Sequence, residues 1–315
     1  MQEYINSRIA DCLFYKSVSD GKKADAEEML EVINKFESIV KFINEDETLQ
    51  PKDKETYLSY CYNTIGYTYD QKYKNVGDDK DDITKAIDFS KKAVDNPGNM
   101  AKKQLARYTR NLGLAYQHVG SIDEAVKKYK ESVALDRSDY KSWNNIASVT
   151  LTIMEKDLKI SGRKKALCEF SDNDFRNYED KLKYAKTACE MSISINPVFI
   201  DPYYKLINVH TYLYLGGYDQ VENRAKGIER IDFLDSINSE ARGFWFAKRN
   251  FYEALGEIQE ANKCNDKIME KESQGNDTLE MKDIYQAYLE KQGEAVVENS
   301  SEEPDSGANK SDEED

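Results

Sequence analysis

Hydrophobic residues recur every three or four positions over most of the chain, which is the spacing of one face of an α-helix. Such runs occur in three regions: Leu30, Ile33, Ile39 and Phe42; Ala86, Phe89 and Ala93; and Ile228, Ile231 and Leu234. Ser121 and Glu124 fit a capping box, in which the serine side chain accepts from a helical N–H and the glutamate reaches back. The pattern predicts an all-α protein whose helices are joined by short turns.

Residues 106–139 show a regular order of small and aromatic residues. Gly113 and Ala125 are small, which lets two helices approach closely, and Tyr116 and Tyr129 fill the space beside them. In this order the segment resembles a tetratricopeptide repeat, a helix-turn-helix unit of about 34 residues. The resemblance implies two antiparallel helices per repeat, here named helix A and helix B in chain order.

The resemblance extends along most of the chain. It places repeats near 59–105, 106–139, 140–199, 200–236 and 242–275, after a degenerate helical pair over 1–58 and before a capping helix over 276–293. A single repeat cannot bury its apolar face alone, so neighbouring repeats stack and bury it for each other. The implied architecture is an α-α superhelix, or solenoid, of about five to six helix pairs with a C-terminal capping helix.

The third repeat carries an insert over 154–179 that interrupts the period. The insert combines a basic run from Arg163 to Lys165 with an acidic run from Asp172 to Asp174. Long insertions in compact arrays are often functional, although an extended helix A with a surface loop explains the same residues. Both interpretations stay open.

Charge is unevenly distributed along the chain. The 59 acidic and 45 basic residues give a net charge of −14, and residues 294–315 alone hold nine acids and one lysine. With no aromatic residue and this charge, we expect 294–315 to be a disordered acidic tail. The tail either competes with a partner for a basic groove or only keeps the chain in solution.

Composition narrows the class of protein. The five cysteines have no C-x-x-C spacing and the histidines number two, which favours free thiols in a reducing, cytoplasmic setting and disfavours a metal site. Neither a nucleophile with a base beside it nor a glycine-rich phosphate loop is visible, and no apolar run is long enough to span a membrane. We therefore expect no catalytic residues, no cofactor and no bound metal.

Helix A residues line the concave face of such arrays. On that resemblance, the candidate peptide-binding residues are Asn63, Tyr67, Arg107, Arg110, Asn111, Lys141, Asn144, Asn145, Lys205 and Asn208. Arginine forks onto carboxylates and asparagine bonds to an extended backbone, so the expected ligand is an extended or acidic segment of another protein. Acids are expected nearer the ends of the groove, at Asp70, Asp201 and Glu253.

The family's co-chaperones use a five-residue carboxylate clamp, which only Asn111 and Lys141 match here. The resemblance therefore implies a non-enzymatic protein–protein interaction scaffold without implying a chaperone tail as its ligand. Two alternatives stay open: a regulatory or accessory subunit of a larger complex, and a helical-repeat nucleic-acid binder, which the net charge disfavours. Self-association through exposed terminal helices is a further option.

Overall fold

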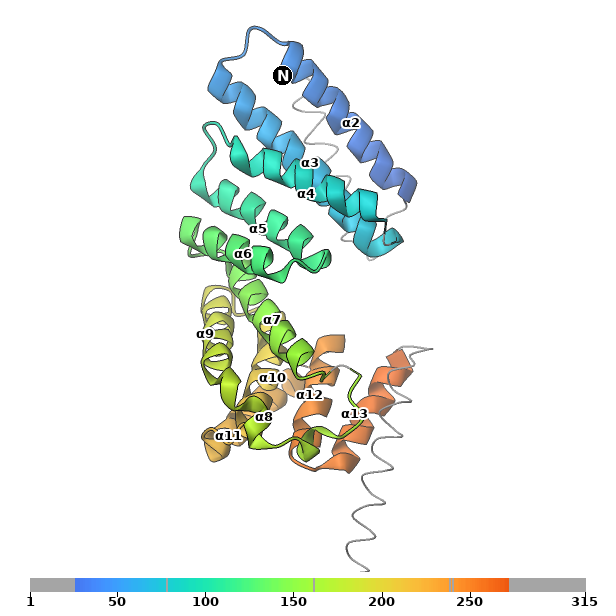
Figure 1. The fold of residues 1–315 in the computed structure, drawn as a ribbon, viewed down its shortest axis with the longest axis vertical. Helices are drawn as coiled ribbons and strands as arrows, with labels where there is room; N and C mark the ends of the chain where they lie inside the picture. The colour runs from blue at the N-terminus through green and yellow to red at the C-terminus, as the bar shows by residue number, and fades with distance from the viewer. Residues whose placement is uncertain (1–25, 78, 161, 238, 240, 272–315) are drawn as a thin grey trace, which may run out of the picture. The chain divides into compact units, whose positions relative to one another are not determined.

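The computed structural model describes residues 26–271 apart from 78, 161, 238 and 240 (Figure 1). The start of the predicted N-terminal pair, the capping helix at 276–293 and the acidic tail at 294–315 lie outside the described residues. The chain divides into two compact units. In the described part, the first unit contains 26–155 with 180–209, and the second contains 156–179 with 210–271.

The first unit is a stack of helices in chain order. Its elements are α2 (Ala26–Glu45), α3 (Pro51–Val76), α4 (Lys80–Asp95), α5 (Lys102–His118), α6 (Ile122–Leu135), most of α7 (Tyr140–Asp157), α9 (Glu179–Ile195) and the start of α10 (Asp201–Leu215). Neighbours along the chain pack together: α2 on α3, α3 on α4, α4 on α5 and α5 on α6 (Figure 1). The all-α prediction is confirmed, and no strand occurs within the described ranges.

Glycine on helix A sets the close approach within two of these pairs. A Cβ on Gly113 would lie 2.7 Å from the ring of Tyr129, and one on Gly66 would lie 2.6 Å from Ser90 Oγ. Ala86 and Ala125 on the facing helices are fully buried. The small residues that identify the repeats in the sequence are therefore where the two helices of a pair come nearest.

A hydroxyl-to-carbonyl hydrogen bond joins helices A and B in three successive pairs. Ser132 Oγ donates to the Ala106 carbonyl at 2.8 Å, and Ser192 Oγ donates to the Tyr140 carbonyl at 2.9 Å. In the α3–α4 pair the roles are exchanged, since Ser59 on helix A donates to the Ala93 carbonyl on helix B at 2.5 Å. All three pairs thus have the same type of contact, although the serine lies on helix B in two of them and on helix A in the third.

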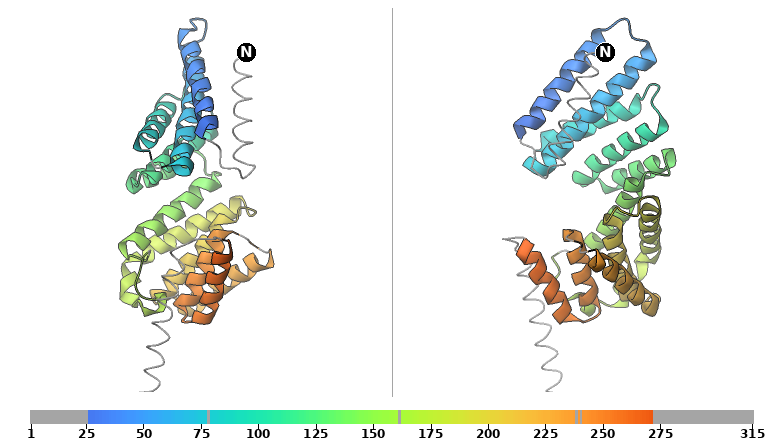
Figure 2. Two further views of the ribbon diagram at one scale, coloured as in Figure 1. Left: turned by 90° about the vertical axis from the view of Figure 1, so that its right-hand side faces the viewer. Right: turned by 180° about the vertical axis from the view of Figure 1, so that it is seen from behind.

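The second unit contains the insert and the last helices. Its elements are η1 (Leu167–Glu169), α8 (Asp172–Phe175), η2 (Arg176–Tyr178), the end of α10, α11 (Gln220–Ser236), α12 (Arg242–Ala254) and α13 (Ile258–Lys271). Helices α12 and α13 lie side by side in both views of Figure 2, and η1 packs on α12. Phe175 of α8 is fully buried and stacks on Tyr212 of α10, with ring centroids 5.8 Å apart.

One local detail differs from the sequence-based expectations. Ser121 is the N-cap residue of α6, but its side chain makes no capping hydrogen bond, so the expected capping box does not form. Its ψ of 72° is far from the extended value of a capping residue, because the turn at Gly120 is tight. In the insert, α7 continues to Asp157 before the chain leaves the helix.

No helix within the described ranges has the length and apolar character needed to cross a membrane.

Candidate partner-binding pocket

A pocket of about 330 Å³ opens in the first unit between α3, α5, α7 and the start of α10. Its lining residues are Tyr67, Arg107, Arg110, Asn111, Leu114, Lys141, Asn144, Asn145, Phe199 and Asp201. Those from α5 follow the spacing i, i+3, i+4 and i+7, so they share one helix face. Those from α7 are spaced in the same way. The pocket is thus the meeting place of two polar helix faces.

Most of the candidate residues from the sequence reach this pocket, and Asn63, Lys205 and Asn208 do not line it. Asn63 lies behind Asn111, whose Nδ2 donates to Asn63 Oδ1 at 3.0 Å. Lys205 lies behind Asn144 and donates to Asn144 Oδ1 at 3.0 Å. Asn208 Oδ1 is buried and has no hydrogen-bond partner among the described residues.

Three lining residues, Leu114, Phe199 and Asp201, are not among the ten candidate binding residues from the sequence. Phe199 lies in the connection before α10, and its ring packs edge-on against Tyr140 with centroids 5.1 Å apart. A helix-face count does not include connecting residues, so no signal in the sequence pointed to Phe199. Asp201 was expected towards one end of the groove, and it lies at the N-terminus of α10.

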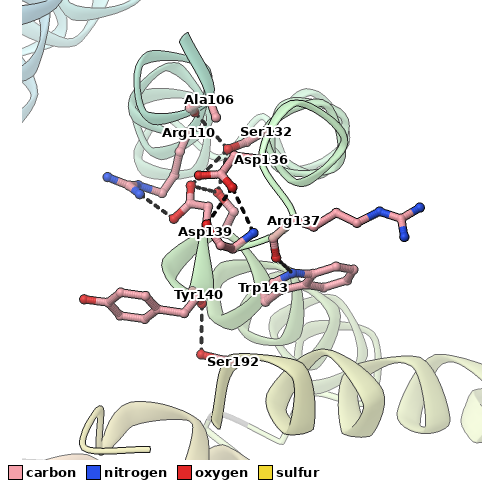
Figure 3. A network of polar contacts seen from close by, with 11 residues as sticks. Ala106, Arg110, Ser132, Asp136, Arg137, Asp139, Tyr140, Trp143 and Ser192 are labelled. Carbon is pink, nitrogen blue, oxygen red and sulfur yellow. Dashed lines mark hydrogen bonds and ion pairs between the residues drawn. The ribbon is translucent and has the colours of Figure 1, made fainter. Parts of the chain in front are cut away.

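The cations of the pocket are not equivalent. Arg110 Nη1 lies 2.7 Å from Asp139 Oδ1, whereas Arg107 and Lys141 form no ion pair with any residue that the structure describes. Asp139 Oδ2 lies 3.0 Å from Ser132 Oγ (Figure 3). It also accepts from Ser142 Oγ at 2.7 Å. One of the three cations, Arg110, is therefore already paired with an acid. Asp139 stands just before helix A of its repeat, outside the positions that were counted as groove-lining.

Burial shapes the remaining polar groups. Asn144 is 4% exposed and Asn111 is 9% exposed, so each amide contributes to the pocket mainly through one end. Burial lowers the pKa of Lys205, and the Asp201 carboxylate at 3.8 Å opposes that shift. Leu114 and Phe199 add apolar surface to the wall. The pocket therefore presents cations and amides beside a small apolar area.

Comparisons with known proteins identify the architecture. No family model matches the sequence, and no curated protein matches it at a significant level. Among solved structures, pilF of Pseudomonas aeruginosa is 10% identical with a TM-score of 0.53, covering 90% of this chain and 99% of its own. The assembly chaperone of RpL4, Acl4 (residues 1–338), is 9% identical with a TM-score of 0.52, covering 92% and 99%.

These likenesses and the observed helix pairs agree on one helical-repeat architecture. The chain has a tetratricopeptide-like fold. A Thermus thermophilus protein described as a thermophilic TPR protein is also similar, at 13% identity and a TM-score of 0.45 over 76% of this chain and 98% of its own.

The other reactive side chains of this tetratricopeptide-like chain are held in its packing. His118 Nδ1 lies 2.6 Å from Asp70 Oδ1, and His210 Nδ1 lies 2.8 Å from Asn223 Oδ1. Burial raises the pKa of Cys189 to about 12 and that of Cys264 to about 11, so both thiols are protonated near neutral pH. Within the described ranges, no group of His, Cys, Asp and Glu is placed to hold a metal ion.

Proposed function

We propose that this chain is a non-enzymatic protein–protein interaction scaffold whose pocket takes an extended segment of a partner with acidic side chains. The observation that carries the proposal is the pair of cations, Arg107 and Lys141, that share one pocket and lack ion-pair partners among the described residues. A guanidinium and an ammonium left open in a concave site favour a carboxylate ligand.

The other lining residues suit a peptide better than a small ion. Amide groups of Asn111, Asn144 and Asn145 can bond to a peptide backbone, which offers both donors and acceptors. Leu114 and Phe199 give apolar contact for a side chain between the acidic ones. Since the helices hold these groups in place before binding, little ordering is needed on the protein side.

The local cations stand out against an acidic chain. A net charge of −14 repels nucleic acid at long range, which argues against the helical-repeat nucleic-acid binder. An accessory subunit of a larger complex fits the same site, and the similar protein Acl4 is itself named as an assembly chaperone. We also propose that the protein is cytoplasmic, as the free thiols lead us to expect.

The test is selection of random linear peptides on the full chain, followed by affinity measurement on variants. We expect enrichment of acidic sequences, and a loss of about tenfold or more in affinity for the Arg107→Ala/Lys141→Ala variant, which is about 1.4 kcal/mol. The matched control is Lys103→Ala/Lys127→Ala, which removes the same charge from exposed positions outside the pocket. Equal losses in the two variants would overturn the pocket as the binding site.

A further inference from the structure

The orientation of one buried amide in the pocket is determined by its neighbour. Lys205 Nζ lies 3.0 Å from Asn144 Oδ1, and an ammonium group can only donate hydrogen bonds. The amide oxygen of Asn144 therefore faces Lys205, and its NH₂ group points elsewhere. The described residues form no other hydrogen bond with the Asn144 side chain. Asn144 is only 4% exposed and lines the pocket.

We propose that Lys205 is a positioning residue that fixes Asn144 as a hydrogen-bond donor to the bound partner. The inference rests on the proposed function, and it adds which atom of the pocket meets the ligand. Lys205 itself does not line the pocket, so it acts through Asn144. The ligand group opposite Asn144 is then an acceptor, either a carboxylate or a backbone carbonyl.

Lys205 is largely buried and has two contacts besides Asn144. Its side chain is 12% exposed, Asp201 Oδ2 lies 3.8 Å from Nζ, and the ring of Tyr204 lies 5.3 Å from Nζ. Asp201 is four residues earlier on α10, so both residues occupy one face of that helix. An amide without such a neighbour has two orientations of similar energy, and one of them turns its oxygen towards an acidic ligand. Lys205 removes that unfavourable orientation before binding.

The neighbouring groups extend the same donor surface. Arg107 on α5 and Lys141 on α7 add cationic groups to the pocket, while Arg110 is held by Asp139. The pocket thus combines two open cations with one oriented amide donor. This arrangement favours an acceptor-rich ligand and disfavours a basic one.

A double-mutant cycle tests the proposal. The probe is a fluorescent peptide of alternating Asp and Glu with both ends capped, titrated against the full chain and read by anisotropy. We expect Asn144→Ala and Lys205→Met each to weaken binding about tenfold, and the double variant to bind no more weakly than Asn144→Ala alone. Multiplied losses in the double variant would show that Lys205 acts independently, which overturns the proposal.

Salt separates positioning from simple charge. A loss that arises through a neutral amide changes little with ionic strength, whereas the loss of a nearby charge shrinks as salt rises. Lys205→Arg keeps a donor and should retain most of the affinity. A loss in Lys205→Met that disappears at high salt would contradict the proposal.

Asn144→Asp provides a second test that leaves Lys205 intact. Lys205 then holds one carboxylate oxygen and the other faces the pocket, so binding should be weaker than in Asn144→Ala while the chain stays folded. Equal binding by Asn144→Asp and Asn144→Ala would overturn the proposal. If the probe binds Arg107→Ala/Lys141→Ala as tightly as the unchanged chain, or binds neither, the proposed function itself fails and this inference fails with it.

Discussion

The pocket beside α5 and the face of α12 use polar helix A residues in opposite ways. In the first unit, Arg107 and Lys141 are left without ion pairs among the described residues. In the second unit, Glu253 of α12 is fully buried and accepts from Arg163 Nη2 and from the Leu167 backbone N–H, both at 2.7 Å. Both donors come from the insert.

The difference shows how an insert changes the role of a repeat face. Glu253 was expected as an acid near one end of the groove, yet Arg163 and the start of η1 neutralise it and cover it. Ala166 and Leu167 of the same segment are fully buried. The two interpretations of the insert, a functional insertion and an extended helix A with a surface loop, did not include a core role for its central part. The unpaired cations of the first unit mark the candidate binding surface, whereas the paired Glu253 of the second unit has a structural role.

The largest expected effect comes from the covered face. Glu253→Gln keeps the shape of the side chain but leaves the Arg163 guanidinium buried without a charge partner, since Arg163 is 6% exposed. We expect the free energy of unfolding to fall by about 3 kcal/mol, as when one partner of a buried ion pair is removed. Chemical denaturation followed by circular dichroism measures it.

Glu257→Gln is the matched control, because Glu257 pairs with Arg224 at 3.3 Å on the surface of the same unit. Exposed pairs of this kind contribute below about 1 kcal/mol. Similar losses in the two variants would mean that the insert does not bury the Glu253 pair, and the contrast with the open pocket would fail.

Arginines of the pocket separate structural from binding roles. Arg110→Ala leaves Asp139, which is 8% exposed, without its guanidinium, although Ser142 still donates to it. We expect a loss of about 2 kcal/mol in the free energy of unfolding for Arg110→Ala. Arg107→Ala should cost below about 1 kcal/mol, since it removes no ion pair. The reverse order in a denaturation series would exchange the roles assigned to the two residues.

Replacing the glycine at the helix crossing by alanine should have a smaller effect on the free energy of unfolding, and it should destabilise the protein. Alanine normally stabilises a helix interior relative to glycine by about 1 kcal/mol. At Gly113 the added methyl group meets the fully buried Tyr129, so we expect Gly113→Ala to destabilise by about 1–2 kcal/mol. Gly77→Ala is the control, because no atom lies within 4 Å of its new Cβ and its φ is 168°. A stabilised Gly113→Ala protein would show that α5 and α6 are not in close contact.

Sequence reasoning predicts the helix pairs well because their determinants are local. Gly113, Ala125 and the aromatic residues near them report one helix crossing, and a periodic pattern is enough to detect it. The site is predicted less completely. Helix-face counting found Arg107, Lys141 and Asn144, but it treated Arg110 as open because the acid that binds it, Asp139, lies in the turn before α7.

The insert was beyond such reasoning for a physical reason. Its contact between Arg163 and Glu253 joins residues 90 positions apart, and no local period encodes a contact of that range. Phe199 escaped for a related reason, since a connecting residue has no helix face. At Ser121 the sequence predicted a contact that does not form. The residues fit the capping-box motif, but the backbone of a tight turn prevents the hydrogen bond.

The smallest expected effect is the pH dependence of stability that comes from buried cysteines, and it should be the same in both units. Cys189 lies in the first unit and Cys264 in the second, and burial raises their pKa values from 9.0 to about 12 and about 11. A folded-state pKa above the unfolded one gives stability that is complete below the unfolded pKa and is lost as pH rises towards the folded pKa. Both thiols should therefore lose about 1 kcal/mol of their stabilising contribution between about pH 8 and pH 10.

Alanine variants isolate this contribution from the titration of lysines and tyrosines. The difference in unfolding free energy between the unchanged chain and Cys189→Ala should shrink over that pH range, and Cys264→Ala should behave in the same way. If the difference stays constant for Cys264 alone, its thiol ionises in the folded chain. Water then reaches the packing of α12 and α13, and the second unit is less closed than the satisfied Glu253 implies. The open pocket and the covered face would then differ less than their hydrogen bonds suggest.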